Sequence, residues 1–416
     1  MSQVHKRLSD EQARFVLKQY QAGVLSRTAA QQALGIGKTR FFALLRRYAQ
    51  QPEGFSVAYH RSASPRLDVD CVAAIHHELE RERELVENPA LPISGYNYSA
   101  VHDRLRDLGV KVSLTTIINR AKASGCYRGH PRHKSHDREV ITTAPGALIQ
   151  HDASTHQWSP FVDTKWVLIA SIDDYSRMLL YARFFPQEST WAHLLAVKSL
   201  VEAYGLPLAY YVDNLRVFRF VQDRDSFWRN QVARTDQVDP QWKQAMQLLG
   251  IKVEYALSPQ AKGKIERPFS WLQDRIVRTC ALEHLTTIDE AQAVLQTEVE
   301  RYNTHQVHST TKEIPEIRFH NARRLGHFLF RPYVLPKPYT FADDIFCLRT
   351  TRVTDGYRRI RVANQAIEVP AVLPREYVEL HLVPNPDTNV MHVRIWHEGR
   401  LVRRVDCPLE PFRVHF

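Results

Sequence analysis

The sequence has little that would suit a membrane or an oxidising compartment. No segment reaches the roughly 18 uninterrupted apolar residues that a membrane span needs. Residues 1–10 are polar and charged, without the apolar region of a signal peptide. The five cysteines are scattered and form no CxxC pair, which predicts reduced, structural thiols. We therefore expect a cytoplasmic protein with no membrane partner.

A zinc site has little support in the sequence. His130, His133 and His136 have a ligand-like spacing, but they lie in a Pro-, Arg- and Lys-rich stretch without a second pair of ligands. Contact with phosphate, or plain solvation, is the better interpretation of these histidines, and zinc binding is the alternative.

Basic residues are in excess. Lysine and arginine number 56 against 45 for aspartate and glutamate, which gives a formal net charge of +11. Such an excess favours a polyanionic partner, nucleic acid first, although a basic surface without a partner has the same composition. The 416 residues, 44% of them apolar, predict several folded units.

The N-terminal 51 residues predict a helix-turn-helix domain. Ser9 can cap a first amphipathic helix, a second covers 28–34 and ends at Gly35, and a third begins near Lys38. Basic side chains on the third helix lie largely off its apolar face, as in a recognition helix that contacts DNA: Lys38, Arg40, Arg46 and Arg47. Three short basic helices also occur in proteins that bind no DNA.

A linker-like stretch at 52–66 leads to a second helical unit, at 67–127. Its expected helices cover 69–86, 99–109 and a segment capped by Ser113, and the last two again predict a helix-turn-helix. Arg120 and Lys122 are the candidate DNA contacts there. Residues 128–144 form a basic linker, predicted to extend along DNA.

From residue 145 to 315 the pattern predicts an α/β domain. The expected order is β-β-β-α-β-α-β-α, a mixed sheet flanked by helices in which the first three strands form an antiparallel meander. The predicted segments are strands 147–154, 166–173, 178–185, 208–212 and 252–255, and helices 191–204, 241–249 and one beginning near Pro268. The fold class is thus multidomain α/β.

The C-terminal residues 338–416 predict a small β domain. Short strands are expected at 346–349, 358–362, 378–382, 390–396 and 401–405, with turns at Asp355-Gly356 and Asn385-Pro386 between some of them. A small β-barrel, or a sandwich, fits this spacing.

Three acidic residues stand where elements of the α/β domain end or meet. Asp152 lies in the first strand, Asp213 ends the fourth, and Glu266 lies in the loop expected before the long helix. Carboxylates bind hard divalent cations and offset the repulsion between two of them, so two Mg²⁺ ions, replaceable by Mn²⁺, are predicted here. Such a pair activates a water or a DNA 3′-hydroxyl for attack on phosphorus.

These segments resemble insertion-sequence transposases of the Asp-Asp-Glu class, whose catalytic core is of the retroviral-integrase, ribonuclease H-like type. The resemblance includes the aspartate of the first strand, Ile172-Asp173-Asp174-Tyr175-Ser176-Arg177, Tyr211-Val212-Asp213-Asn214, the 258–267 segment Ser-Pro-Gln-Ala-Lys-Gly-Lys-Ile-Glu-Arg, and Arg301-Tyr302-Asn303 with His308. It covers roughly residues 145–315.

The resemblance implies that Asp152, Asp213 and Glu266 are the catalytic, metal-binding triad. It also implies four DNA contacts near the active site: Gln260, Lys262, Lys264 and Arg267. The implied partners are double-stranded DNA, as element terminal inverted repeats and target, and further copies of the chain in a multimer. A bacterial, nucleoid-associated protein would follow.

The sequence departs from that pattern in three ways. The gap between Asp213 and Glu266 is longer than in retroviral integrases, and residues 215–238 account for the excess. Pro268 favours a helix that begins after Glu266, which leaves the metal geometry of Glu266 less defined. The paired His and Cys residues of the retroviral N-terminal zinc domain are absent.

Three other interpretations stay open. The three acids could be unrelated charges, and Asp173 and Asp174 could support the metal ligands instead of only forming a turn in which Asp174 is the cap. The whole protein could be a DNA-binding regulator derived from a transposase that has lost catalysis. It could also be a metal-dependent nuclease without strand transfer.

Overall fold

The computed structural model describes residues 4, 7–58, 67–129, 142–213, 241–255, 263–363 and 365–412. The chain divides into two compact units, Met1–Val72 and Ala73–Phe416. Within the described residues, none of the helices combines the length and the apolar character that crossing a membrane requires. His130, His133 and His136 lie outside the described residues.

The first unit contains three helices around a small apolar core: α1 (Asp10–Gln21), α2 (Arg27–Leu34) and α3 (Lys38–Gln50). Ser9 caps α1 in a capping box, as its hydroxyl side chain predicts. Gly35 ends α2 at a φ of 65°, a conformation that glycine adopts readily. Phe41 and Leu44 of α3 are buried in this core. The order of helices and turn fits the expected helix-turn-helix, which stays a prediction.

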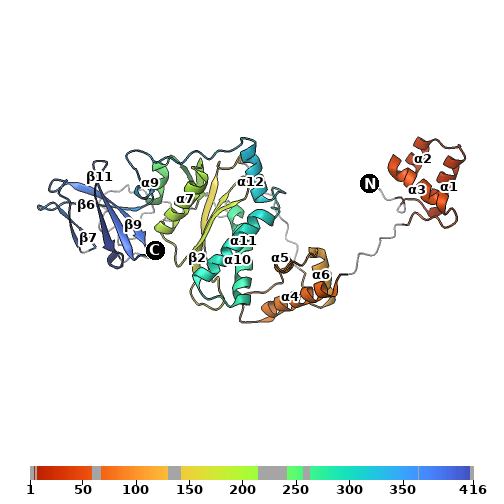
Figure 1. Ribbon diagram of the computed structural model, residues 1–416, viewed down its shortest axis with the longest axis horizontal. Helices are drawn as coiled ribbons and strands as arrows, with labels where there is room; N and C mark the ends of the chain where they lie inside the picture. The colour runs from red at the N-terminus through yellow and green to blue at the C-terminus, as the bar shows by residue number, and fades with distance from the viewer. Residues whose placement is uncertain are drawn as a thin grey trace. The chain divides into compact units, whose positions relative to one another are not determined.

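The second unit begins with a helical module (Figure 1). Its helices are α4 (Val69–Glu87), α5 (Tyr98–Asp107) and α6 (Leu114–Ala123). Ser113 caps α6 as predicted, because its hydroxyl accepts a hydrogen bond from the Thr116 amide at 3.2 Å. The α5 and α6 helices pack against each other, and their helix-turn-helix assignment is likewise a prediction.

A five-stranded mixed sheet follows, in the order β3-β2-β1-β4-β5. The β1–β2–β3 meander is antiparallel, as predicted, and β4 pairs with β1 and β5 in parallel. Every residue of β2 is buried, because helices cover both faces of the sheet. The strands are β1 (Ile149–His156), β2 (Trp166–Asp173), β3 (Leu179–Phe185), β4 (Ala209–Val212) and β5 (Lys252–Tyr255).

Helices pack on both faces of this sheet (Figure 1). One face packs against α7 (Thr190–Tyr204) and α9 (Gln241–Leu248), and the other against α10 (Gly263–Glu283) and α11 (Ile288–His305). Asn303 joins α11 to β3, because its side chain both accepts from the Leu179 amide and donates to the Leu179 carbonyl, at 2.9 Å each. The expected mixed α/β architecture is confirmed.

The expected start of α10 is wrong. The helix begins at Gly263, not near Pro268, so Glu266 lies in its first turn. Proline is tolerated near a helix N-terminus because the first four amides have no partner inside the helix. Pro268 is the sixth residue of α10 and lies beyond these amides, so its missing N–H removes one backbone hydrogen bond from the helix.

The C-terminal part of the second unit follows α12 (Pro315–Arg324) and consists mainly of strands. It contains a four-stranded sheet, β11-β10-β9-β6, and a two-stranded sheet, β7-β8. The described strands form these two separate sheets, so the expected small barrel is not confirmed. The strands are β6 (Leu348–Val353), β7 (Arg359–Val362), β8 (Gln365–Glu368), β9 (Tyr377–Asn385), β10 (Val390–His397) and β11 (Arg400–Pro408).

Candidate active site

Two of the three predicted acids lie at matching positions on neighbouring strands. In the parallel β1–β4 pair, Ile149 is opposite Tyr210 and Gln150 is opposite Tyr211. Asp152 and Asp213 come two residues after Gln150 and Tyr211, so the same register brings them to one level. Neighbouring strands are about 4.8 Å apart, and residues that share a register position share a face. Counted from the last paired residues, Asp152 and the residue that follows β4, Asp213, occupy matching positions on neighbouring strands.

The face of β1 that carries Asp152 is the face covered by α10. Side chains alternate along a strand, so Asp152 and Ser154 point to the same side. Ser154 accepts a hydrogen bond from the Gln273 amide of α10 at 3.0 Å. His151, the residue before Asp152, points to the opposite face, where its ring contacts that of His193 of α7 at 2.8 Å. Asp152 is 9% exposed.

The same contacts give the direction of α10. Gln273 lies beside Ser154, and further along both elements the Ser159 hydroxyl donates to the Leu285 carbonyl at 2.6 Å. The helix therefore runs in the direction of β1, and its N-terminal turn, with the exposed Glu266, lies toward the end of β1 that carries Asp152. Glu266 precedes Gln273 by two helical turns and shares its helix face.

No metal-binding cluster has formed among these acids. Within the described ranges, no three His, Cys, Asp or Glu side chains lie close enough together to hold a metal ion. Residues 214–240, after Asp213, and 256–262, before α10, lie outside the described residues. Of the expected DNA contacts, Gln260 and Lys262 fall in the second of these segments, and the side chain of Lys264 is also outside the description.

The buried pair after β2 forms a turn between β2 and β3. The Asp173 carboxylate accepts hydrogen bonds from the Gly146 amide at 2.9 Å and from the Ser176 hydroxyl at 2.6 Å. Asp174 binds Arg177 at 2.9 Å and Gln150 at 2.6 Å. The turn interpretation fits these contacts, but Asp173, not Asp174, is the cap.

Burial raises the pKa of Asp173 to about 6, although its hydrogen-bond donors act in the opposite direction. Such a shift can mark a catalytic acid. Here the contacts with Gly146 and Ser176 explain why the group is buried, and they give it a structural role in the turn.

Arg267 is exposed and lies beside the loop that follows α11. Its Nη1 is 3.5 Å from the Ser309 hydroxyl, next to His308. Burial, followed by the positive charges of Arg177 and Arg267, lowers the pKa of His308 to about 4. At pH 7 the His308 imidazole is therefore neutral and adds no positive charge beside Arg267.

The other predicted DNA contacts lie away from the acids in sequence. In the first unit, all four basic residues of α3 are exposed, although Nη2 of Arg47 donates to the Ser56 carbonyl at 3.1 Å. In the second unit, Arg120 of α6 is half-buried and Lys122 is exposed, 4.8 Å from the centre of the Tyr127 ring.

Known proteins related to this chain are transposases. It is 29% identical over 290 residues to a putative transposase, y4bF, of Sinorhizobium fredii, a match that covers 67% of this chain and 58% of that protein. It is 32% identical over 171 residues to the transposase for insertion sequence IS1202 of Streptococcus pneumoniae, with 41% and 34% covered. The chain is thus similar in sequence to two transposases, one of them from an insertion sequence. No family model matches it.

Solved structures with a partial likeness are integrases. The intasome structure of simian T-cell lymphotropic virus, in complex with a regulatory subunit of PP2A, has 14% identity and a TM-score of 0.36, with 75% of this chain and 96% of that chain covered. The catalytic core of HTLV-2 integrase with magnesium has 15% identity and a TM-score of 0.32, with 42% and 98% covered. These TM-scores are too low to support an argument, so the similarity to transposases rests on the sequence matches alone.

The chain spans less than two thirds of the length of the two curated transposases that it matches. The sequence prediction placed Asp152 in β1 and Asp213 at the end of β4, but it placed Glu266 in a loop instead of in α10, and it overlooked residues beyond Pro268. Ser270, Gln273 and Val277 follow Glu266 at i+4, i+7 and i+11, a spacing that keeps them on one helix face. That periodicity was the signal available in the sequence for the groove described below.

Proposed function

We propose that the chain is a DNA transposase that binds element ends, hydrolyses a phosphodiester bond to expose 3′-hydroxyl ends, and joins those ends to target DNA. The observation that supports the proposal is the register of β1 and β4, because their last paired residues, Gln150 and Tyr211, each precede one of the two predicted acids by two residues. The kinship with transposases agrees with this chemistry.

The residues at this edge suit a divalent metal. Carboxylate oxygens are the donors that Mg²⁺ takes in proteins, and Asp152 and Asp213 would provide them from neighbouring strands. Glu266, in the first turn of α10, would provide the third carboxylate. When bound, a pair of Mg²⁺ or Mn²⁺ ions would activate the attacking oxygen and stabilise the leaving oxygen.

The remaining groups would bind and orient DNA. The exposed basic residues of α3 and α6 would bind phosphates and base edges of the element end, since such contacts come from helices laid against a groove. Arg267, adjacent to Glu266, would hold the backbone near the reacting phosphate. Bringing two ends together requires more than one copy of the chain, so we propose a homo-multimer on DNA.

Two alternative functions predict different outcomes with the same DNA. A regulator derived from a transposase would bind the ends without cutting them, and a metal-dependent nuclease would cut them without joining. The presence of all three acids favours an active enzyme over the regulator. The strand-joining step separates the transposase from the nuclease.

The test uses the full-length protein with duplex DNA that carries the flanks of the native gene, in Mg²⁺ or Mn²⁺. We expect nicked ends and joined products, which denaturing gels and sequencing of the junctions detect. Cutting without joining would establish the nuclease. Binding without cutting, under conditions that assemble a paired complex, would establish the regulator.

A further inference from the structure

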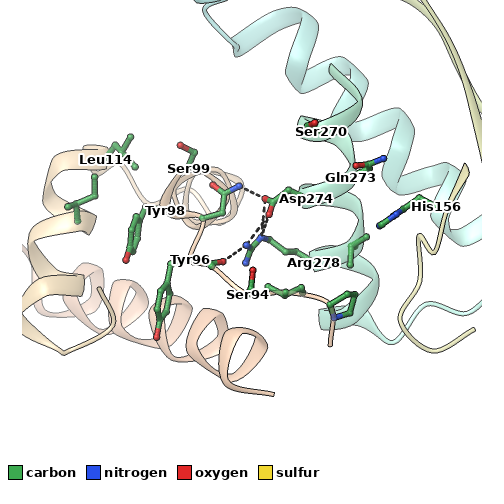
Figure 2. Close-up of a pocket in the computed structure, with 16 residues that line it drawn as sticks. Ser94, Tyr96, Tyr98, Ser99, Leu114, His156, Ser270, Gln273, Asp274 and Arg278 are labelled. Atoms are coloured by element: carbon green, nitrogen blue, oxygen red, sulfur yellow. Dashed lines mark hydrogen bonds and ion pairs between the residues drawn. The ribbon is translucent and has the colours of Figure 1, made fainter. Parts of the chain in front are cut away.

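A groove of about 660 Å³ lies between the helical module and α10 in the second unit. Figure 2 shows its two sides, with Tyr98, Ser99 and Leu114 from the helical module and Ser270, Gln273, Asp274 and Arg278 from α10. His156, at the end of β1, also lines it. The volume is in the range of pockets that bury one small organic molecule.

Buried ion pairs hold the two walls together. Arg278 of α10 is 3% exposed, and it binds Glu82 of α4, the Gly95 carbonyl and Asp274. Glu82 is fully buried and is also bound by Arg104 of α5 at 3.0 Å. The groove is therefore part of one packed arrangement, since charges buried in this way cannot separate without a large energetic cost.

The floor of the groove continues the helix face that carries Glu266. Ser270 is one helical turn after Glu266, about 6 Å along the axis at 1.5 Å per residue. Gln273 and Val277 extend the same face deeper into the groove. A strand held at Glu266 thus meets the mouth of the groove within about one turn of α10.

The lining suits a neutral, polar and ring-bearing ligand better than a phosphate. Among the described residues that line the groove, Asp274 is the one acid and Arg278 the one fixed cation, and the two are paired at 3.0 Å. Hydroxyl and amide groups provide much of the remaining polar lining, from Ser94, Ser99, Ser270, Asn97 and Gln273. Such groups read the edges of a base, and the serine hydroxyls are the better candidates, because the Asn97 side chain already binds Asp274 and that of Gln273 binds Ser154.

We infer that this groove receives one unstacked nucleotide of the element end, next to the phosphate that is attacked. Enzymes that do chemistry on a base take its nucleotide out of the stack into a pocket that binds the base by hydrogen bonds and apolar contact, and the lining of this groove offers both kinds of contact. The base would lie between α10 and the start of α5, with its backbone at Glu266. The inference rests on the proposed function, because it assigns the occupant from the position of the reacting phosphate.

The test scans the last nucleotides of the element end with 2-aminopurine, whose fluorescence rises when it leaves the stack. Duplexes are mixed with the full-length protein in EDTA, so that cutting does not interfere. Two variants plug the groove from opposite walls, Ser270→Trp and Ser99→Trp, at positions that are exposed. Gln296→Trp, on the exposed side of α11, is the matched control.

We expect a fluorescence rise at one position with wild type and with the control, and loss of that rise in both plugged variants. End binding, measured by anisotropy on the same duplexes, is expected to persist in all of them. Binding by wild type without any unstacked position, or a rise that both plugged variants retain, would overturn this inference alone. Failure of wild type to bind the ends at all would overturn the proposed function as well.

Discussion

His381 is the residue at which the polar contacts of the four-stranded C-terminal sheet meet. Its ring is fully buried, and its nitrogens contact Asp344 at 3.2 Å and Glu379 at 3.1 Å. Burial lowers the pKa of His381, but the hydrogen bonds to these partners outweigh burial and raise the pKa to about 10. Two guanidinium groups also lie near the ring, because Nη1 of Arg349 is 2.8 Å from its Nε2 and Arg394, its cross-strand neighbour, forms its own ion pair with Asp344 at 2.6 Å.

This shift predicts a pH dependence of stability. Because the folded pKa of His381 is above the ordinary 6.5, its stabilising contribution is complete below about pH 6.5 and is lost as the pH rises through about 10. We expect His381→Gln to be less stable than wild type at pH 7 and to lose less stability between pH 7 and 10. Denaturant midpoints at each pH measure this, and parallel losses in both proteins would contradict it.

Among elements, α4 and α10 are joined by a side chain whose removal should be costly. Arg278→Ala would leave Glu82 buried with a single cationic partner, Arg104. Breaking a buried ion pair from one side costs about 3–5 kcal/mol. We expect a loss of that size in the free energy of unfolding of the second unit, measured by denaturant titration.

The control for this change is Arg83→Ala, since Arg83 forms its ion pairs at the surface of α4. Exposed pairs contribute about 0–1 kcal/mol. Equal losses of unfolding free energy in the two variants would contradict a stabilising role for the buried ion pair between Arg278 and Glu82.

The sequence allowed the elements of the sheet to be predicted better than the packing around them. The bounds of β2 and β5 were predicted correctly, and for β2 the reason is an apolar run with β-branched residues that ends at the turn residues Asp173 and Asp174. The start of α10 was not, because Pro268 reads as a helix start, while tertiary packing of Ile265 and Phe269 holds an earlier turn. The ion pairs of Arg278 and the arrangement of the C-terminal strands in two sheets could not be predicted from local sequence, because both depend on residues far apart in the chain.

The register of β1 and β4 was likewise beyond the sequence. Asp152 and Asp213 were each predicted at a strand, but the parallel pairing of those two strands follows only from the fold. The direction of α10, which turns Glu266 toward them, depends on contacts such as Gln273 with Ser154.

On the scale of the whole molecule, the net charge of +11 predicts salt-dependent binding to DNA. Each phosphate contact that is lost lowers the salt slope of log K by about 0.9. Replacing Lys38, Arg40, Arg46 and Arg47 by Gln is therefore expected to lower the slope by up to about 3.6. Anisotropy titrations at several salt concentrations measure it.

The control for the salt experiment is Lys18→Gln, an exposed change on α1 of the same unit. We expect it to leave the slope near that of wild type. A four-residue variant with the wild-type slope would show that α3 does not contact phosphate.

The most direct test of the account is whether cutting depends on the three acids. Asp152→Asn, Asp213→Asn and Glu266→Gln are compared with Asp163→Asn, which removes an exposed acid of the same domain, in Mg²⁺ with duplexes that carry the flanks of the native gene. We predict that the first three variants bind the ends but make no nicked or joined product, while Asp163→Asn acts like wild type. Products from any of the three, at the wild-type rate, would contradict the assignment of the active site.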